Sequence, residues 1–240
     1  MNKISKCNVG VWSLIDSFSV LTMLLESDVD FVVFDYEHGL WQRHQLVTAS
    51  RICKSANKYS VARIPNPTQE WIQLAHDSYS DVVQIAGIKS QSDIDKVSLL
   101  IEYPPSGTLG FSPWTFQGLK VGNRSDYFPK ICLQFEDLRI VQSFIQNELI
   151  LSSNINSIFI GRYDLSISMG YPGEIDNPKL LHLIELVKLK ADEQGIFLGT
   201  VSNSIADSLI IRSIGVDFIS IGSDVLRLSE NTQTKENKWI

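Results

Sequence analysis

Charged and amide side chains stand at the ends of four short apolar runs in the sequence. They are Asp35 and His38 after Phe31–Phe34, Arg63 within Ser60–Ile64, Gln134 and Glu136 at the end of Ile131–Phe135, and Arg162, Tyr163 and Asp164 after Ser157–Ile160. Carboxylates bind hard divalent cations, a histidine carries protons near neutral pH, and an arginine stabilises negative charge. If the fold brings these positions together, the side chains form a metal and acid–base site.

Each of these residues also has an ordinary structural explanation. Arg63 can form an ion pair with Asp35 or Glu136, and Glu136 and Asp164 can be helix N-caps or acids in the first helical turn. His38 alone is more often a loop histidine than a catalytic base. Their joint position favours the functional interpretation, because charged groups there are costly to desolvate unless they are paired or bind a metal.

The other chemistry-bearing residues lack this placement. His44, His76 and His182 fall in helical stretches, so we expect them on the surface or in packing. The chain has 3 cysteines without metal-type spacing, which is typical of a reduced cytoplasmic protein. It has no glycine-rich nucleotide loop and no serine nucleophile elbow. Two carboxylates without cysteine ligands favour Mg²⁺, Mn²⁺ or a similar ion over structural zinc.

Short runs of apolar and β-branched residues predict the strands that position these groups. They are Val9–Leu14, Phe31–Phe34, Ser60–Ile64, Val82–Ala86, Ile131–Phe135, Ser157–Ile160, Ile196–Thr200 and Phe218–Ile221. They do not alternate cleanly between apolar and polar residues, which is typical of strands buried on both faces of a parallel sheet.

Longer stretches with helical spacing separate these runs. They are Ser17–Ser27, Trp41–Ala56, Thr68–Asp77, Ser90–Ile101, Glu136–Leu149, a short one at Leu165–Met169, Asn177–Gln194 and Ser202–Ser213. Eight β–α units in 240 residues predict a (β/α)8 TIM barrel, with a doubly wound open sheet as the alternative. In a barrel the carboxyl ends of the strands converge on one face, where active sites lie.

Length, composition and charge favour an ordinary soluble globular protein. The chain is 44% hydrophobic and 20% charged, and its 21 basic and 27 acidic residues give a net charge of −6. This balance disfavours nucleic acid as a partner, and no apolar stretch is long enough to span a membrane. We expect one barrel domain over residues 1–230 and a polar tail over 231–240. The connection from Glu102 to Lys130 is long enough to be functional or disordered.

Six motifs, in this order along the chain, resemble the HpcH/HpaI family of class II pyruvate aldolases. They are Phe34-Asp35-Tyr36-Glu37-His38-Gly39, Val61-Ala62-Arg63-Ile64-Pro65, Tyr103-Pro104-Pro105-Ser106-Gly107, Gln134-Phe135-Glu136, Ile160-Gly161-Arg162-Tyr163-Asp164-Leu165-Ser166 and Ile221-Gly222-Ser223-Asp224. The resemblance runs from about Val9 to Leu228. It implies a barrel of the phosphoenolpyruvate/pyruvate-domain type and a homo-oligomer, a hexamer or trimer of dimers that exchange the last helix.

The resemblance also implies roles for the site residues. Glu136 and Asp164 would ligate a divalent metal ion, Mg²⁺, Mn²⁺ or Co²⁺. His38, supported by Asp35, would be the acid–base residue, and Arg63 would contact the keto oxygen of pyruvate. Gln134 would line the site, and backbone amides near Tyr163 and Asp164 would receive the substrate carboxylate.

Three positions depart from the family pattern. Leu109 stands where an arginine is usual, Ala86 where a strand usually ends in proline, and Arg162 where proline usually follows Gly161. These departures touch loops that would shape the aldehyde side of the pocket. Arg162 would either bind an extra anionic group of the substrate or be a surface charge.

Three functions are compatible with these residues. The favoured one is metal-dependent cleavage of a 4-hydroxy-2-oxo acid or 2-oxo-3-deoxy sugar acid to pyruvate and an aldehyde. A decarboxylase that uses the same enolate, for example on oxaloacetate, is the first alternative. A barrel that has lost catalysis and serves in binding or assembly is the second. A Schiff-base aldolase is disfavoured because no lysine stands at a strand end in this set.

Overall fold

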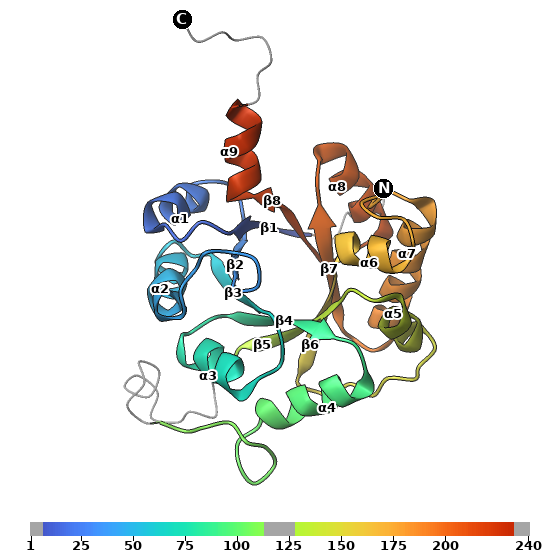
Figure 1. Cartoon of the computed structure of the whole chain (residues 1–240), viewed down its shortest axis with the longest axis horizontal. Coiled ribbons are helices and arrows are strands. Elements are labelled where there is room, and N and C mark those ends of the chain that lie inside the picture. Colours follow the sequence, from blue (N-terminus) through green and yellow to red (C-terminus); the bar gives the residue numbers. More distant parts are fainter. Residues whose placement is uncertain (1–6, 113–127, 233–240) are drawn as a thin grey trace, which may run out of the picture.

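The computed structural model describes residues 7–112 and 128–232, with no side chains beyond 229. It is a closed barrel of eight parallel strands (Figure 1). The strands are β1 (Asn8–Ser13), β2 (Phe31–Asp35), β3 (Tyr59–Ile64), β4 (Val82–Ile88), β5 (Lys130–Phe135), β6 (Ile155–Ile160), β7 (Phe197–Ser202) and β8 (Phe218–Ser223). Each strand pairs with the next in sequence and β8 pairs with β1. The predicted TIM barrel is therefore confirmed, and the open-sheet alternative is wrong.

Helices follow the strands and surround the barrel. They are α1 (Phe18–Leu25), the 3₁₀ turn η1 (Arg43–Gln45) with α2 (Leu46–Ser55), α3 (Gln69–Asp77), α4 (Gln91–Leu100), α5 (Leu138–Ile145), α6 (Arg162–Ser168), α7 (Pro178–Glu193), α8 (Ile205–Ile214) and α9 (Asp224–Thr232). Serine, threonine, aspartate or asparagine side chains cap the N-termini of α1, α3, α5, α7 and α8, which satisfies backbone amides that the helix leaves unpaired.

The start of α5 matters for the site. Asp137 is its N-cap, and its carboxylate accepts a hydrogen bond from the backbone N–H of Arg139 at 2.8 Å. The alternative that Glu136 serves as a helix cap is therefore wrong, because Glu136 precedes the cap at the end of β5. Asp164, in contrast, does lie in the first turn of α6.

Aromatic side chains line the amino-terminal end of the barrel interior. The rings of Phe31 and Phe218 lie 6.1 Å apart, edge to face. They occupy space beside Gly10 and Gly199, where an added Cβ would lie 2.1 Å from a ring atom. The main core, built from aliphatic residues such as Ile85 and Leu133, lies between the strands and the helices.

The helix α9 extends away from the barrel and packs only at its start, against β1 and β8 (Figure 1). The carboxylate of Asp224 accepts hydrogen bonds from the backbone N–H groups of Leu14 and Ile15 at 3.0 Å, which fastens this start to the loop after β1. Val225 and Leu228 are 46% and 55% exposed. The helix continues to Thr232, so the first two residues of the expected tail are helical.

The described part of the long connection before β5, up to residue 112, packs against α3. Leu109 is buried, and the backbone N–H of Gly110 donates to the side-chain oxygen of Gln73 at 2.8 Å. Residues 113–127 of this connection, which we expected to be functional or disordered, lie outside the described residues. Among the helices that the structure describes, none is long and apolar enough to cross a membrane.

Candidate active site

A cavity of about 350 Å³ opens at the carboxyl ends of the strands. Seven of the eight residues that we expected at the site line it: Asp35, His38, Arg63, Gln134, Arg162, Tyr163 and Asp164. The eighth, Glu136, borders it through Gly161, where an added Cβ would lie 2.8 Å from the Cγ of Glu136. The barrel thus brings together residues that are far apart in sequence, as the positions at the strand ends predicted.

Two acids at the end of the neighbouring strand β2 and in the loop after it, together with an aromatic ring, hold Arg63 in place. Its Nε donates to Asp35 at 2.9 Å and its Nη2 forms an ion pair with the same carboxylate at 2.5 Å. Its Nη1 lies 2.9 Å from Glu37, and the guanidinium carbon lies 4.6 Å from the ring centre of Trp12. A guanidinium has five N–H donors, so two remain for another acceptor. The structural ion pair and an anion-binding role are therefore compatible.

Asp35 organises the loop that carries His38. Its carboxylate accepts hydrogen bonds from the backbone N–H groups of Glu37 and His38 at 2.9 and 3.1 Å. Asp35 therefore supports His38 through the backbone rather than through the imidazole ring. The His38 side chain is exposed at the cavity, where solvent and a substrate can both reach it.

The negative charges of three carboxylates, Glu37, Glu136 and Asp164, repel one another at the site. Burial raises the pKa of Glu136, and the charges of Glu37 and Asp164 raise it further, although a hydrogen bond from Gln134 and the charge of Arg63 oppose the rise. Burial raises the pKa of Glu37 as well, against the opposing charge of Arg63. These carboxylates are partly removed from water and repel one another, and a bound cation would offset the free-energy cost of both effects.

The site's polar contacts extend into the barrel through two glutamines. Gln134 donates a hydrogen bond to the Oε1 of Glu136, and Gln84 on β4 donates to the Oε1 of Gln134. Both glutamines are 2% exposed. Gln84 was not among the predicted site residues, because it stands within an apolar run and follows no strand end.

Arg162 occupies a different position from the one expected. Its side chain is fully buried, and Nη1 and Nη2 donate to the two carboxylate oxygens of Asp207 at 2.8 and 2.9 Å. Nε and Nη1 also donate to the backbone carbonyls of Ile175 and Val201 at 3.1 and 2.9 Å. The surface-charge alternative is therefore wrong, and the guanidinium that would bind a substrate anion is already engaged with α8 and β7.

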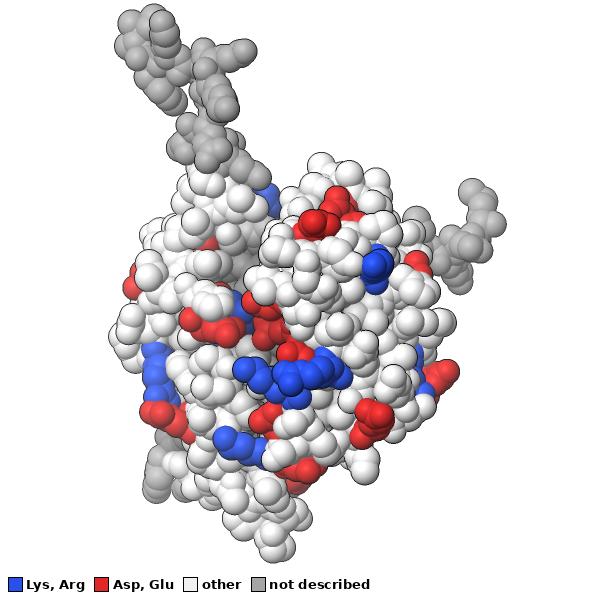
Figure 2. Space-filling view, turned by 45° about the vertical axis from the view of Figure 1, so that its right-hand side comes forward, with Lys and Arg blue, Asp and Glu red and all other residues white. Residues whose placement is uncertain are grey.

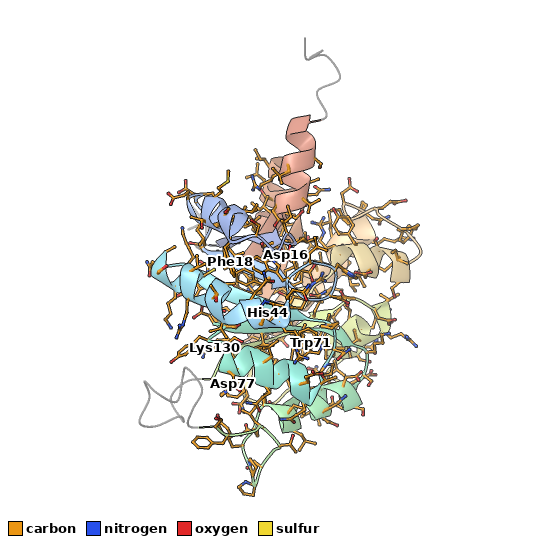
Figure 3. The ribbon with its side chains drawn as sticks, turned by 60° about the vertical axis from the view of Figure 1, so that its left-hand side comes forward. Asp16, Phe18, His44, Trp71, Asp77 and Lys130 are labelled. Carbon is orange, nitrogen blue, oxygen red and sulfur yellow. The ribbon has the colours of Figure 1, made fainter. Side chains whose placement is uncertain are left out.

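The remaining histidines and departures lie away from this cavity. His44 is exposed on the outside of the barrel near α2 (Figure 3), His182 is exposed on α7, and His76 is buried in packing against Tyr103. Leu109 and Ala86 are both buried and do not line the cavity. Among the described residues, neither Leu109 nor Ala86 lines the cavity whose aldehyde side we expected them to shape.

The donor set allows a test of whether a divalent cation fits. The described residues contain no group of three or more His, Cys, Asp or Glu side chains arranged to hold a metal ion. Glu136 and Asp164 supply two hard oxygen donors, as Mg²⁺ and Mn²⁺ sites require, and two protein ligands leave positions for water and a chelating substrate. The set fits an ion bound jointly by protein and substrate.

Acidic and basic side chains are otherwise intermixed on the face seen in Figure 2.

Comparisons with known proteins agree with this fold. A hydroxypyruvate/pyruvate aldolase of Agrobacterium fabrum is 23% identical over 239 residues, which cover 98% of this chain and 90% of that protein. A 5-keto-4-deoxy-D-glucarate aldolase of Salmonella paratyphi C is 23% identical over 231 residues, covering 94% and 89%. The crystal structure of an HpcH/HpaI aldolase from Desulfitobacterium hafniense superposes with a TM-score of 0.84 at 22% identity, over 98% and 95% of the two chains. The family model of HpcH/HpaI aldolase/citrate lyase matches residues 8–230, so the chain belongs to this family.

Proposed function

We propose that the chain is a divalent-metal-dependent lyase that reversibly cleaves a 4-hydroxy-2-oxo acid or a 2-oxo-3-deoxy sugar acid to pyruvate and an aldehyde. The observation that carries this proposal is the convergence of Glu136, Asp164 and the braced Arg63 at one cavity in a member of this family. The names of the two aldolase relatives support the same reaction class.

Glu136 and Asp164 would hold the metal ion. A bound divalent ion would supply positive charge that offsets the negative charge developing on the pyruvate unit. The hydrogen bond from Gln134 would keep one oxygen of Glu136 oriented. Gln134 and the backbone near Tyr163 would line the pyruvate position.

Arg63 would stabilise the developing oxyanion directly. Asp35, Glu37 and Trp12 hold its guanidinium in place before substrate binds, so the two free N–H groups need no reorganisation during the reaction. In the cleavage direction the C3–C4 bond breaks, its electron pair forms the pyruvate enolate, and Arg63 donates to the former keto oxygen.

His38 would move the protons. In cleavage it would accept the proton of the C4 hydroxyl, whose oxygen becomes the aldehyde oxygen, and a proton returned to C3 of the enolate would complete pyruvate. Its exposed ring at the cavity allows it to exchange that proton with solvent. A decarboxylase would not need this base, so replacing His38 with alanine separates the two activities: aldol cleavage would be lost and decarboxylation of oxaloacetate would survive.

We also propose that the protein is a homo-oligomer and that α9 contributes to its interface. The helix leaves the barrel with Val225 and Leu228 exposed, and such apolar side chains on an extended helix favour burial against a second copy. Light scattering of the wild type and of Leu228→Lys tests this: we expect a defined oligomer that dissociates in the variant. A monomeric wild type would refute it.

Proton exchange of the pyruvate methyl group in D₂O, followed by NMR, tests the chemistry without an aldehyde. We expect exchange with Mg²⁺, Mn²⁺ or Co²⁺, none with EDTA, and a loss on Glu136→Gln. Glu185→Gln on the outer helix α7 is the matched control, because its carboxylate pairs with His182 at the surface, away from the cavity, and the change should leave exchange unchanged. If the folded wild type shows no proton exchange with any of these metal ions, the proposal is refuted and a barrel without catalysis is favoured.

A further inference from the structure

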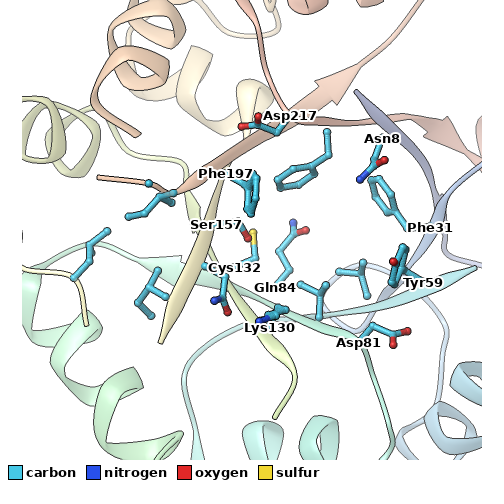
Figure 4. A pocket seen from close by; sticks show the side chains of 18 of the residues that line it. Asn8, Phe31, Tyr59, Asp81, Gln84, Lys130, Cys132, Ser157, Phe197 and Asp217 are labelled. Carbon is cyan, nitrogen blue, oxygen red and sulfur yellow. The ribbon is translucent and has the colours of Figure 1, made fainter. Parts of the chain in front are cut away.

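The barrel interior contains a buried amide that the reaction described above does not use. Gln84 lies on β4, between Arg63 of β3 and Cys132 of β5 in the strand register. Figure 4 shows its side chain beside those of Cys132 and Ser157, at the wall of a second cavity that opens at the amino ends of the strands. A buried amide is costly unless its polar atoms are paired, so its partner indicates what it does.

The hydrogen-bond chain from Gln84 can run in only one sense. An ionised carboxylate accepts hydrogen bonds and cannot donate them, so Gln134 must present its NH₂ group to Glu136. Its carbonyl oxygen then points the other way, where the NH₂ group of Gln84 donates to it. Gln84 therefore supplies the donor for the Oε1 of Gln134 and so opposes a flip of the Gln134 amide.

Gly161 makes the position of Glu136 exacting. The Cγ and Oε1 of Glu136 lie where the side chain of any larger residue at 161 would begin, at 2.8 and 3.1 Å from an ideal Cβ. The carboxylate thus has a backbone on one side and the Gln134 amide on the other. A change in the amide changes which way the carboxylate oxygens point.

We propose that Gln84 is a positioning residue for the divalent cation: through Gln134 it fixes the orientation of the Glu136 carboxylate. This inference rests on the proposed function, since it takes Glu136 as a metal ligand. Gln84 itself touches neither substrate nor cation. Partners that orient metal ligands typically affect metal affinity by roughly 10- to 100-fold when they are removed.

The test measures binding of Mn²⁺ alone to the full chain by isothermal titration calorimetry. Gln84→Met keeps the length of the side chain and removes its donor, and we expect Mn²⁺ to bind about tenfold more weakly. Ser157→Ala is the matched control, because Ser157 lines the same second cavity and takes no part in the hydrogen-bond chain from Gln84 to Glu136. It should bind Mn²⁺ as the wild type does.

A double-mutant cycle separates positioning from packing. If Gln84 acts through Gln134, the variant Gln84→Met/Gln134→Met should bind Mn²⁺ no more weakly than Gln134→Met alone. Independent, multiplicative losses would overturn the proposal. So would a Gln84→Met variant that binds Mn²⁺ within about twofold of the wild type.

A measurement on the wild type covers the case in which Gln84→Met does not fold. In a spectrum of ¹⁵N-labelled protein, the side-chain NH₂ signals of Gln84 and Gln134 should both shift on saturation with Mg²⁺. A shift of Gln134 alone would overturn the proposal. A wild type that exchanges pyruvate protons and binds Mn²⁺, but ignores Gln84→Met, refutes only this inference; a wild type that does neither refutes the proposed function as well.

Discussion

Replacing Arg162 with methionine tests the most deeply buried charge in the described chain. The guanidinium is fully buried and donates to both oxygens of Asp207 and to the carbonyls of Ile175 and Val201. Methionine fills much of the same volume but donates no hydrogen bond. The substitution therefore leaves a carboxylate that is 7% exposed without its counter-charge, and two backbone carbonyls without a donor.

The expected loss of stability follows from these contacts. Breaking a buried ion pair by removing one partner costs about 3–5 kcal/mol, because the remaining charge is uncompensated. Each orphaned carbonyl adds about 1 kcal/mol or more where water cannot reach it. We expect a total of about 5–7 kcal/mol, which is a large part of the ~5–15 kcal/mol that stabilises a typical domain. At this chain length that corresponds to a melting temperature lower by roughly 10–30 °C.

The same pair predicts the pH dependence. Burial alone would raise the pKa of Asp207, but hydrogen bonds and charge from Arg162 outweigh it, so the pKa lies below the ordinary value of 3.8. A carboxyl whose folded-state pKa is lowered contributes stability that is fully present above its unfolded-state pKa. That stability is lost as the pH falls through the folded-state value. The wild type should therefore lose stability below about pH 4 through this group, and Arg162→Met should lack that part of the loss.

Urea unfolding of the wild type, Arg162→Met and Arg162→Met/Asp207→Leu measures these effects. The double variant should be more stable than the single one, because it removes the unpaired charge. Arg139→Met is the control, since its ion pair with Asp137 is at the surface and should contribute nothing measurable. A loss below about 1 kcal/mol in Arg162→Met would refute the reasoning, as would a double variant less stable than the single.

Three further predictions concern the site. Gly161→Ala places a methyl group 2.8 Å from the Cγ of Glu136, so calorimetry should show about tenfold weaker Mn²⁺ binding with little change in melting temperature; unchanged affinity would contradict the geometry. Trp12→Leu removes the ring 4.6 Å from the guanidinium of Arg63, and we expect a loss of roughly 0.5–2 kcal/mol in urea unfolding and a higher KM for pyruvate; wild-type values for both would exclude a bracing role. Mn²⁺ at one hundred times its Kd should stabilise the protein by about 2.7 kcal/mol, and EDTA should reverse the shift in melting temperature; an equal shift in Glu136→Gln would place the ion elsewhere.

The sequence could predict most of the barrel because each strand is a short apolar run bounded by polar residues. All eight runs became strands, with β4 extending to Ile88 rather than ending at Ala86. The local pattern did not predict α9, since its residues after Asp224 are largely polar and pack little against the barrel; the family resemblance alone implied a last helix. Its existence depends on contacts that no local pattern encodes.

The site was predictable as far as it follows strand ends. Asp35, Arg63 and Gln134 stand at positions that a parallel barrel must bring together, and they line one cavity. The partner of Arg162 could not be predicted, because Asp207 lies 45 residues away on another helix. Gln84 was missed for the opposite reason: a single amide in an apolar strand carries no signal until the register shows what it faces.

The seam between β1 and β8 has a consequence for how the chain is made. The strands that close the barrel come from its two ends, and Asp224 joins the loop after β1 across 210 positions. At a typical synthesis rate of roughly 5–20 residues per second, β1 waits on the order of 10–40 seconds for its last neighbour. During that time its outer edge is an open strand that can pair with other chains. The strand that the ribosome delivers last is therefore the one that ends this exposure and completes the mouth of the active site.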